Sequence, residues 1–244
     1  MSFTFSKRII FCLIACLLSA CASQQPVITV APPAAVAATT GQTQYWWYVN
    51  YRIQWPENTE PKFYIDLLLA DAVIEPILIQ HRNSITYWRF HRRALRDKAG
   101  HQFSFIFYAD KTTARSIYQQ VKKNEITKKM LVMNILQQIL MDDPDKNDLT
   151  NVNATSDKNW PVKLQNAWPA YIMGVSNTWL QLIDQEITDN KTGNDINHLL
   201  EEYKKADAKI SKIWYDYGQH AFIHHLNAIF GYEPVLLNKD PLQF

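Results

Sequence analysis

The sequence predicts an α+β protein in which a ferredoxin-like β-α-β-β-α sheet layer is followed by a helical half. Three observations support this prediction. Segments whose side chains alternate between apolar and polar are typical of strands, and they occur in three places. A segment with helical spacing separates the first strand from the second, and another follows the third. The chain beyond residue 124 then carries apolar residues mainly at helical spacing.

The three expected strands cover residues 45–55, 85–94 and 101–108. In the first strand the side chains of one face are Tyr45, Trp47, Val49, Tyr51, Ile53 and Trp55. Phenylalanines at 103, 105 and 107 form the matching face of the third strand. The second and third strands are separated only by a short loop that ends at Gly100, so they form a hairpin.

Two helices are expected in the sheet layer. The first covers residues 61–81 and is kinked or ended by Pro76. The second is capped by Thr112 or Thr113 and runs to about Asn124.

The helical half is expected to begin with a helix over 125–141, followed by a polar insertion over 142–159. The aspartates of that insertion lack the spacing of a calcium loop, so we expect a solvated loop. Apolar stripes predict a helix over 164–187 and either one long helix over 196–229 or two helices separated at Gly218. A closing strand is expected at 233–238.

Both helices of the sheet layer should cover one face, which leaves a polar and basic face opposite. That face would carry Asn50, Arg52, Gln54, Arg89, His91, Arg93, Gln102 and Ser104. We expect it to contain the main binding surface, and the candidate binding residues are Arg52, Arg89, His91, Arg93, His101 and His225. The alternatives are a solvated face without a ligand, or arginines that pair with carboxylates beneath another element.

The N-terminus has the three parts of an export signal. Lys7 and Arg8 precede an apolar run, residues 9–18, which is too short for a bilayer span of roughly 20 residues. The run closes in Leu18-Ser19-Ala20-Cys21, which resembles the lipobox of bacterial lipoproteins. The resemblance implies cleavage between Ala20 and Cys21 and acylation of the Cys21 thiol by chains such as palmitate. The alternatives are an ordinary secretory signal or an uncleaved anchor.

The same resemblance predicts the location and the organisation of the chain. Ala22, where an aspartate would retain the protein, implies the outer membrane of the bacterial envelope, with the protein facing the periplasm. We expect a signal peptide over 1–20, the lipidated Cys21 with a flexible linker over 21–44, an α/β sandwich part over 45–124 and a helical part over 125–244.

Composition excludes several classes of function. The chain has 25 Lys and Arg against 23 Asp and Glu, and loss of the signal would make it neutral, so we expect no nucleic-acid partner. Its 3 cysteines all lie within the first 21 residues, which leaves no thiolate metal site. His220 and His224 have a spacing that can bind metal, but a packing or surface role is the simpler interpretation. We therefore expect no cofactor and no metal.

The stretch HHLNAIFG at 224–231 resembles the closing H-x-N-R-L-x-G motif of the C-terminal elimination domain of lanthipeptide dehydratases, a domain also found in thiopeptide-type biosynthesis proteins. The hairpin segments WRFHRR at 88–93 and GHQFSF at 100–105 are similar to W-F-F-I-R-Y and G-P-H-L-R-L-R-F of that family. The resemblance covers about Tyr45 to Gly231 and implies a shared scaffold.

The departures concern the residues that carry the chemistry of the family. Its arginines in the third strand fall on Phe103 and Phe105, and the arginine after the motif asparagine falls on Ala228. The arginine of the R-Y pair falls on Arg92 or Arg93. The family eliminates a glutamyl ester from a tRNA-derived, cytoplasmic substrate, which an exported protein would not meet. The resemblance therefore implies the fold and not the reaction.

The function we expect is that of a non-enzymatic envelope lipoprotein with a binding or assembly role, whose partner is an envelope protein, a peptide or a glycan. An assembly role would be favoured by an exposed apolar patch on the helix with Trp168 and Trp179. The alternative is a hydrolase or lyase that uses His91, His101 or His225 as general base, which requires a cleft where a histidine meets a carboxylate.

Overall fold

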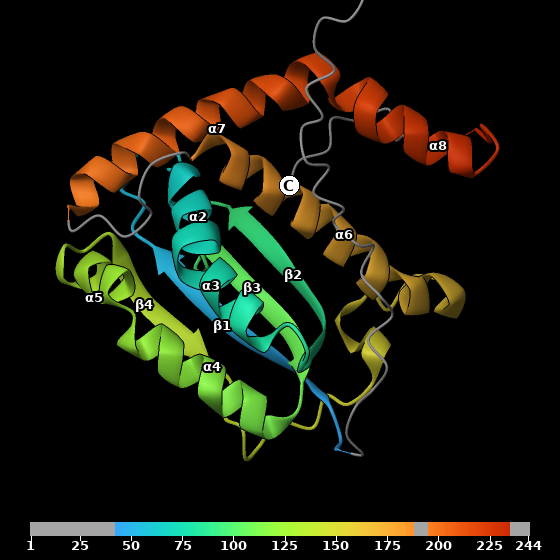
Figure 1. Ribbon diagram of the computed structural model, residues 1–244, viewed down its shortest axis with the longest axis horizontal. Coiled ribbons are helices and arrows are strands. Elements are labelled where there is room, and N and C mark those ends of the chain that lie inside the picture. Colours follow the sequence, from blue (N-terminus) through green and yellow to red (C-terminus); the bar gives the residue numbers. More distant parts are fainter. Residues whose placement is uncertain (1–41, 188–194, 235–244) are drawn as a thin grey trace, which may run out of the picture. The chain divides into compact units, whose positions relative to one another are not determined.

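The computed structural model describes residues 42–187 and 195–234. The chain divides by its contacts into Met1–Ala37 and Ala38–Phe244, and all described residues belong to the second unit. This unit is an α+β structure built on one antiparallel sheet with the strand order β2-β3-β1-β4 (Figure 1). The strands are β1 (Tyr45–Ile53), β2 (Ile85–Ala94), β3 (His101–Ala109) and β4 (Leu136–Met141). The predicted fold class is confirmed at this level.

The helices lie in two groups. The first group belongs to the sheet layer and comprises, in chain order, α2 (Tyr64–Leu68), the π-helix η1 (Leu69–Ile74), α3 (Glu75–His81), α4 (Lys111–Lys123) and α5 (Glu125–Val132). The second comprises the 3-10 helix η2 (Val152–Thr155), α6 (Val162–Glu186), α7 (Ile196–Gly218), the π-helix η3 (Gln219–His224) and α8 (His225–Ile229). In Figure 1 the first group covers one face of the sheet, and α7 continues through η3 into α8, which reaches past the sheet.

The predicted alternation of β1 and β3 is confirmed, and that of β2 holds from Tyr87 onward, because a register shift between Ile85 and Tyr87 places Ile85 in the main core. Trp47 pairs with Phe107, and Tyr51 with Phe103, and all four side chains are fully buried beneath the helices. The hairpin between β2 and β3 turns at Gly100, whose φ of +66° is readily adopted only by glycine. One sheet face therefore forms the main core, to which α6 and α7 also contribute.

The helix predicted over 61–81 begins later, at Tyr64, and contains the π-helix η1. The widened turn ends where the Glu75 N–H bonds to the Ala70 carbonyl, directly before Pro76. Proline has no N–H to donate, so a regular α-helical ladder cannot run through this position. The chain continues as α3 instead of ending.

The next helix is capped by Asp110 and not by Thr112 or Thr113, because the Asp110 carboxylate accepts from the Thr113 N–H at 2.9 Å. Asn124 ends α4 and caps α5 in the same way, through the Thr127 N–H.

The helix predicted over 125–141 is wrong beyond residue 132. Asn134 takes a φ of +54°, the chain turns, and residues 136–141 form β4 beside β1. The sheet layer therefore extends to Met141. The closing strand predicted at 233–238 is not observed at 233–234, and its remainder lies outside the described residues.

The opposite sheet face is partly covered by the polar insertion. Trp46, Ile106 and Tyr108 form a second buried cluster there, packed against Val152 and Ala154 of η2. The Trp46 indole N–H lies 2.9 Å from the Val152 carbonyl oxygen, and the Tyr108 hydroxyl donates to the Thr150 carbonyl. This segment is therefore folded onto the sheet and is more than a solvated loop.

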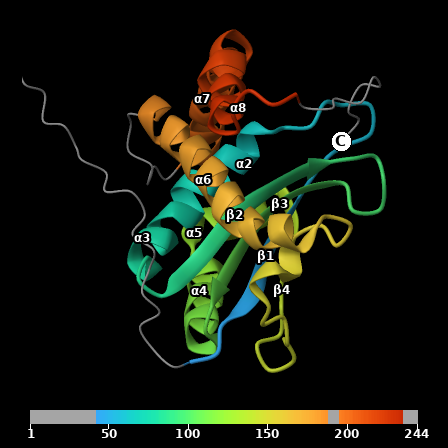
Figure 2. The same cartoon turned by 90° about the vertical axis from the view of Figure 1, so that its right-hand side faces the viewer.

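The long helix α6 lies along the outer edge of β2 (Figure 2). The Ser176 hydroxyl accepts from the Phe90 N–H at 3.1 Å, so the helix takes up a backbone donor of the edge strand. Pro169 lies inside α6, within its first turns. After a segment outside the described residues, Asp195 caps α7 by accepting from the Asn197 N–H.

Candidate functional site

The candidate site is built around a buried aspartate of α2. Asp66 has no exposed surface, and its carboxylate contacts both strands of the hairpin. Oδ2 accepts from Arg92 Nε at 2.8 Å, and Oδ1 lies 3.0 Å from His101 Nε2. Because His101 is also fully buried, the carboxylate links a dry histidine to an arginine that reaches the surface.

The Arg92 guanidinium is held on several sides. It lies 5.0 Å from the ring centroid of Phe63 and 4.8 Å from that of Trp179, and it donates to the Phe63 carbonyl. On α7 the Asp207 carboxylate approaches it to 3.9 Å. Burial raises the pKa of Asp207, the charge of Arg92 lowers it and that of Asp66 raises it further. Arg92 is thus fixed in one orientation, with a half-buried carboxylate beside it.

A groove of about 740 Å³ opens from Arg92 and Asp207. We call it the α6–α7 groove. Its walls are almost entirely apolar: α6 supplies Val175, Trp179 and Leu182, and the opposite wall carries Ile210, Trp214 and Phe222. Concave, mostly apolar sites with a few placed polar groups are typical of ligand or peptide binding.

Apolar side chains stay exposed around this groove. On α6 they include Tyr171 and Val175, and on the other side Trp214 is 59% and Ile223 is 55% exposed. Contiguous exposed apolar surface of this kind marks interaction sites in folded proteins. The patch that would favour an assembly role is therefore present on the predicted helix.

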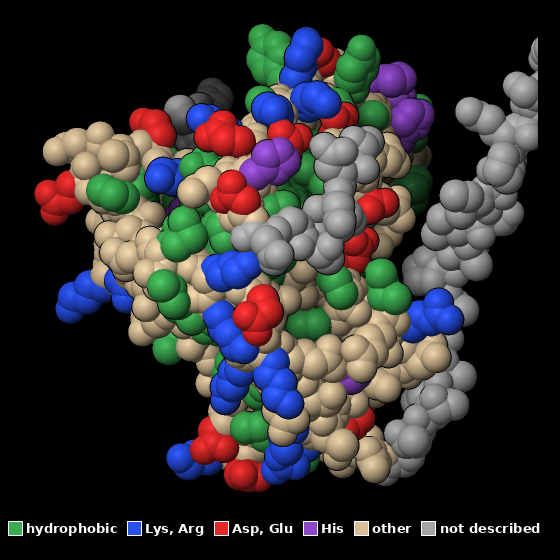
Figure 3. Space-filling view, turned by 60° about the vertical axis from the view of Figure 1, so that its left-hand side comes forward, with side chains coloured by type: hydrophobic (Ala, Val, Ile, Leu, Met, Phe, Trp, Pro, Cys, Tyr) green, Lys and Arg blue, Asp and Glu red, His purple; other side chains and the backbone are tan. Residues whose placement is uncertain are grey.

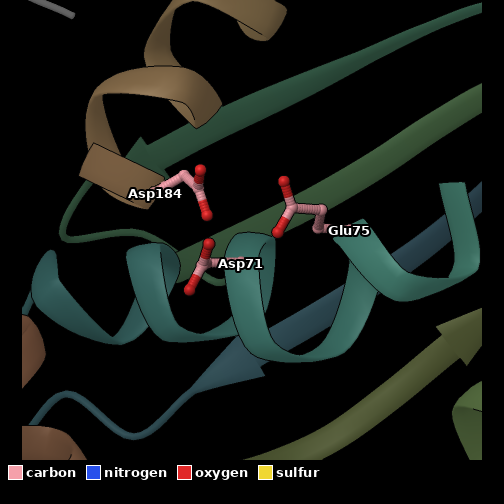
Figure 4. A group of neighbouring side chains, drawn as sticks. All are labelled: Asp71, Glu75 and Asp184. Atoms are coloured by element: carbon pink, nitrogen blue, oxygen red, sulfur yellow. The ribbon is translucent and has the colours of Figure 1, made fainter. Parts of the chain in front are cut away.

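A carboxylate cluster joins η1, α3 and α6. Asp71 of η1, Glu75 of α3 and Asp184 of α6 have ligand oxygens within 4.8 Å of one another (Figure 4). The Tyr203 hydroxyl of α7 donates to Asp71, and burial together with the Asp71 charge raises the pKa of Tyr203. Oxygen donors suit Mg²⁺ or Ca²⁺, so these three residues could hold such an ion.

The predicted basic face does bring four of its candidate residues together. Arg52 of β1 and Arg89, His91 and Arg93 of β2 project from the face opposite the α2–α5 helices. Two of the arginines are already engaged: Arg52 donates to the Lys98 carbonyl, and Arg93 pairs with Asp97. Of these two arginines only Arg93 pairs with a carboxylate, and that carboxylate comes from the exposed hairpin loop rather than from another element that covers the face.

His91 lies between two cations on this face. His91 is exposed at the sheet surface, but its pKa is lowered below the ordinary value. The larger cause is partial desolvation of the ring, and the smaller cause is repulsion from Arg89 and Arg93. Arg89 itself is more deeply placed, and burial lowers the pKa of its guanidinium.

Replacement of Arg89 by glutamine is expected to raise the pKa of His91. A nearby guanidinium disfavours imidazolium, so removing the charge makes protonation easier and moves the midpoint to higher pH. The measurement is an NMR titration of the imidazole protons. Arg115→Gln on α4 removes a charge outside this face and serves as control. An unchanged His91 midpoint in the Arg89 variant would show that Arg89 does not influence this ring.

The other two candidate binding residues do not belong to this face. His101 was expected to be accessible, but it points into the main core because position 101 shares the face of Phe103 and Phe105. His225 lies on α8, an element distinct from the sheet (Figure 1). The three histidines proposed as general bases are thus on separate elements, and only His101 meets a carboxylate, in a dry environment.

A basic strip lies on the helix layer. Figure 3 shows Lys and Arg side chains gathered down the middle of the face that α4 and α5 present. The two helices supply Lys111, Arg115, Lys122, Lys123, Lys128 and Lys129, most of which are exposed. Arg115 pairs with Asp145 and Lys128 with Glu125, so part of the charge is balanced locally.

Sequence reasoning missed the buried acids. Asp71 occupies a position in the apolar stripe of its helix, and an acid at a core position signals a buried partner. Asp66 offers a weaker signal, because its partners come from strands of the following hairpin.

Among residues 42–187 and 195–234, no helix is both long and apolar enough to span a membrane. When the chain is compared with protein-family models, curated proteins and solved structures, it matches none of them.

Proposed function

We propose that this chain is a lipid-anchored protein of the bacterial envelope with a binding role in assembly rather than a reaction, and that its α6–α7 groove receives an apolar segment of an envelope protein. The observation that carries the proposal is the groove itself, with its apolar walls and one charged end. The lipobox at Leu18 to Cys21 supports the anchor and the outer-membrane location.

The extent of the apolar surface favours a protein segment over a small ligand or a glycan. Trp214 lines the groove and is exposed, and Ile229 and Phe230 add exposed apolar surface outside the groove at the end of α8. An amphipathic helix laid into a groove buries such a surface with residues at helical spacing. The Arg92–Asp207 end offers both a donor and an acceptor to a polar residue of that segment.

We also propose that the sheet layer has the ferredoxin-like arrangement. The order β2-β3-β1-β4, with a helical segment between β1 and β2 and another between β3 and β4, supports this assignment. The layer would serve as scaffold: its hairpin holds Arg92 and its outer edge carries α6.

A His-dependent hydrolase or lyase remains the second proposal, and the His101–Asp66 pair is its only support. Because both side chains are fully buried, a substrate could reach the imidazole only if the core opened. Arg92 stands between this pair and the groove, so the pair is better suited to positioning Arg92.

Photocrosslinking in intact cells tests the binding role. A benzophenone side chain at Val175, inside the groove, is expected to give a discrete adduct with an envelope protein. The matched control is Val132 on α5, an apolar residue that is 87% exposed and lies outside the groove. In the same cells Cys21→Ser is expected to release the protein from the membrane fraction and to abolish the adduct. Equal adducts at both positions, or none at Val175, would contradict the groove assignment.

A further inference from the structure

We propose that His220, His224 and His225 bind one late first-row divalent cation, for which Zn²⁺, Ni²⁺ and Cu²⁺ are the fitting ions. These three residues, which we call the histidine cluster, lie where η3 passes into α8. None of them lines the α6–α7 groove, so this inference is independent of the proposed function.

The π-helix explains why three histidines meet. In an α-helix each residue turns by about 100°, so His225, five positions after His220, would lie toward the other side of the helix. Hydrogen bonds of a π-helix run from residue i to i+5, which places residue i+5 above residue i. The η3 segment therefore brings His225 onto the face of His220, where His224 already lies.

The ring positions agree with this reading. The imidazole centroids of His220 and His224 are 5.1 Å apart, those of His220 and His225 5.2 Å, and those of His224 and His225 5.3 Å. The three rings form a nearly equilateral triangle. With metal–nitrogen bonds of about 2.0–2.1 Å, imidazoles on one tetrahedral ion place their ring centres about 5 Å apart.

The ring nitrogens must still turn toward a common point. Among the described residues only the carboxylate cluster has all its ligand atoms within 4.8 Å of one another, so the nitrogens of the three histidines are not yet gathered around one point. All three histidines are exposed, so rotation about their side-chain bonds meets little resistance. In the described part of the chain none of these imidazoles forms a hydrogen bond or an ion pair, so their nitrogens are available to an ion.

The widened turn has its own support on the groove side. Gly218 precedes η3, and a Cβ there would come within 2.9 Å of the Trp214 ring. Because glycine has no Cβ, the Trp214 ring fits against position 218 and stacks on Phe222 at a centroid distance of 5.9 Å. This stacking spans the start of η3 and holds the turn, so the cluster is set by the helix backbone before any ion arrives.

The donor set selects the class of ion. Imidazole nitrogen suits Zn²⁺, Cu²⁺ and Ni²⁺, whereas Mg²⁺ and Ca²⁺ require oxygen ligands. Three protein ligands leave at least one coordination position open to water or to a ligand from another molecule. The nearby Tyr232 ring, 5.5 Å from His224, borders the cluster.

The test is a titration of the full chain, purified in detergent without a polyhistidine tag, with Zn²⁺ and with Ni²⁺ against a chromogenic chelator. We expect one equivalent to bind, and we expect His220→Ala, His224→Ala and His225→Ala each to weaken binding by at least about ten-fold. His198→Ala, which removes an exposed histidine from α7, is the matched control and should bind as the wild type does.

A second measurement separates loss of a ligand from loss of fold. Without metal all four variants should have the melting temperature of the wild type, because the residues are exposed. Added Zn²⁺ should raise that temperature for the wild type and for His198→Ala, and not for the cluster variants. Binding that survives each cluster substitution, or that is lost instead in Asp71→Asn, would overturn the assignment.

Discussion

Replacement of Phe105 by arginine is expected to abolish folding. Phe105 lies at the centre of the helix-covered sheet face, has no exposed surface and stacks on Phe107 at 4.9 Å. Losing a buried phenylalanine costs about 3–5 kcal/mol, and burial of an unpaired guanidinium costs several kcal/mol more. Since a domain is stable by only about 5–15 kcal/mol, little folded protein should remain. Circular dichroism and the soluble yield measure the outcome.

The same substitution on the other face is the control. Gln102→Arg places the new cation beside Arg52 and Arg93 at the polar surface, and it removes the two hydrogen bonds made by the Gln102 side chain. This substitution should lower the free energy of unfolding by about 2 kcal/mol. The comparison matters because the resemblance to dehydratase elimination domains places arginines at 103 and 105. A folded Phe105→Arg protein would show that this face can accept the arginines of that family.

Replacement of Asp66 by alanine is expected to lower the free energy of unfolding by about 3 kcal/mol. The change leaves buried His101 without its partner and removes the strongest contact of Arg92. The value is at the lower end for a broken buried pair because the Arg92 side chain is 30% exposed and keeps access to water. Denaturation in urea, at constant m-value, measures the loss.

Asp145→Ala is the matched control, since Asp145 also pairs with an arginine but is 78% exposed. Exposed ion pairs contribute little, so its effect should stay within about 0.5 kcal/mol. Asp66→Asn, which keeps an acceptor and the size of the side chain, should fall between the two. Equal effects of the two alanine substitutions would mean that the buried network does not stabilise the fold.

Most of the face assignments in the first three strands could be predicted because side chains along a strand alternate with a period of two, even where both faces are buried as in β3. Trp47 and Phe103 are large and apolar while Arg52 and Gln102 are polar, so the pattern has one reading. β4 could not be found in this way. Leu136, Ile139 and Leu140 have the spacing of a helix, and the strand is recognised only by its partner β1.

The candidate site was less predictable, because its members are brought together by tertiary structure. The hairpin places Arg92 and His101 beside Asp66, and no local sequence pattern predicts these contacts. His225 shows a different limit: spacing read on an α-helix separates it from His220, and the π-helix reverses this. The groove has no signature at all in the sequence, since its walls look like ordinary core positions.

The hydrogen bond from the Phe90 N–H to Ser176 also affects how readily copies of the chain aggregate at high local concentration. Under the proposed lipid anchor, copies of the chain would be crowded in two dimensions, and an open strand edge allows neighbouring copies to pair and aggregate. α6 blocks that route at β2, where Ser176 takes up the Phe90 N–H. The β2 edge of the sheet is thus protected against strand pairing between copies.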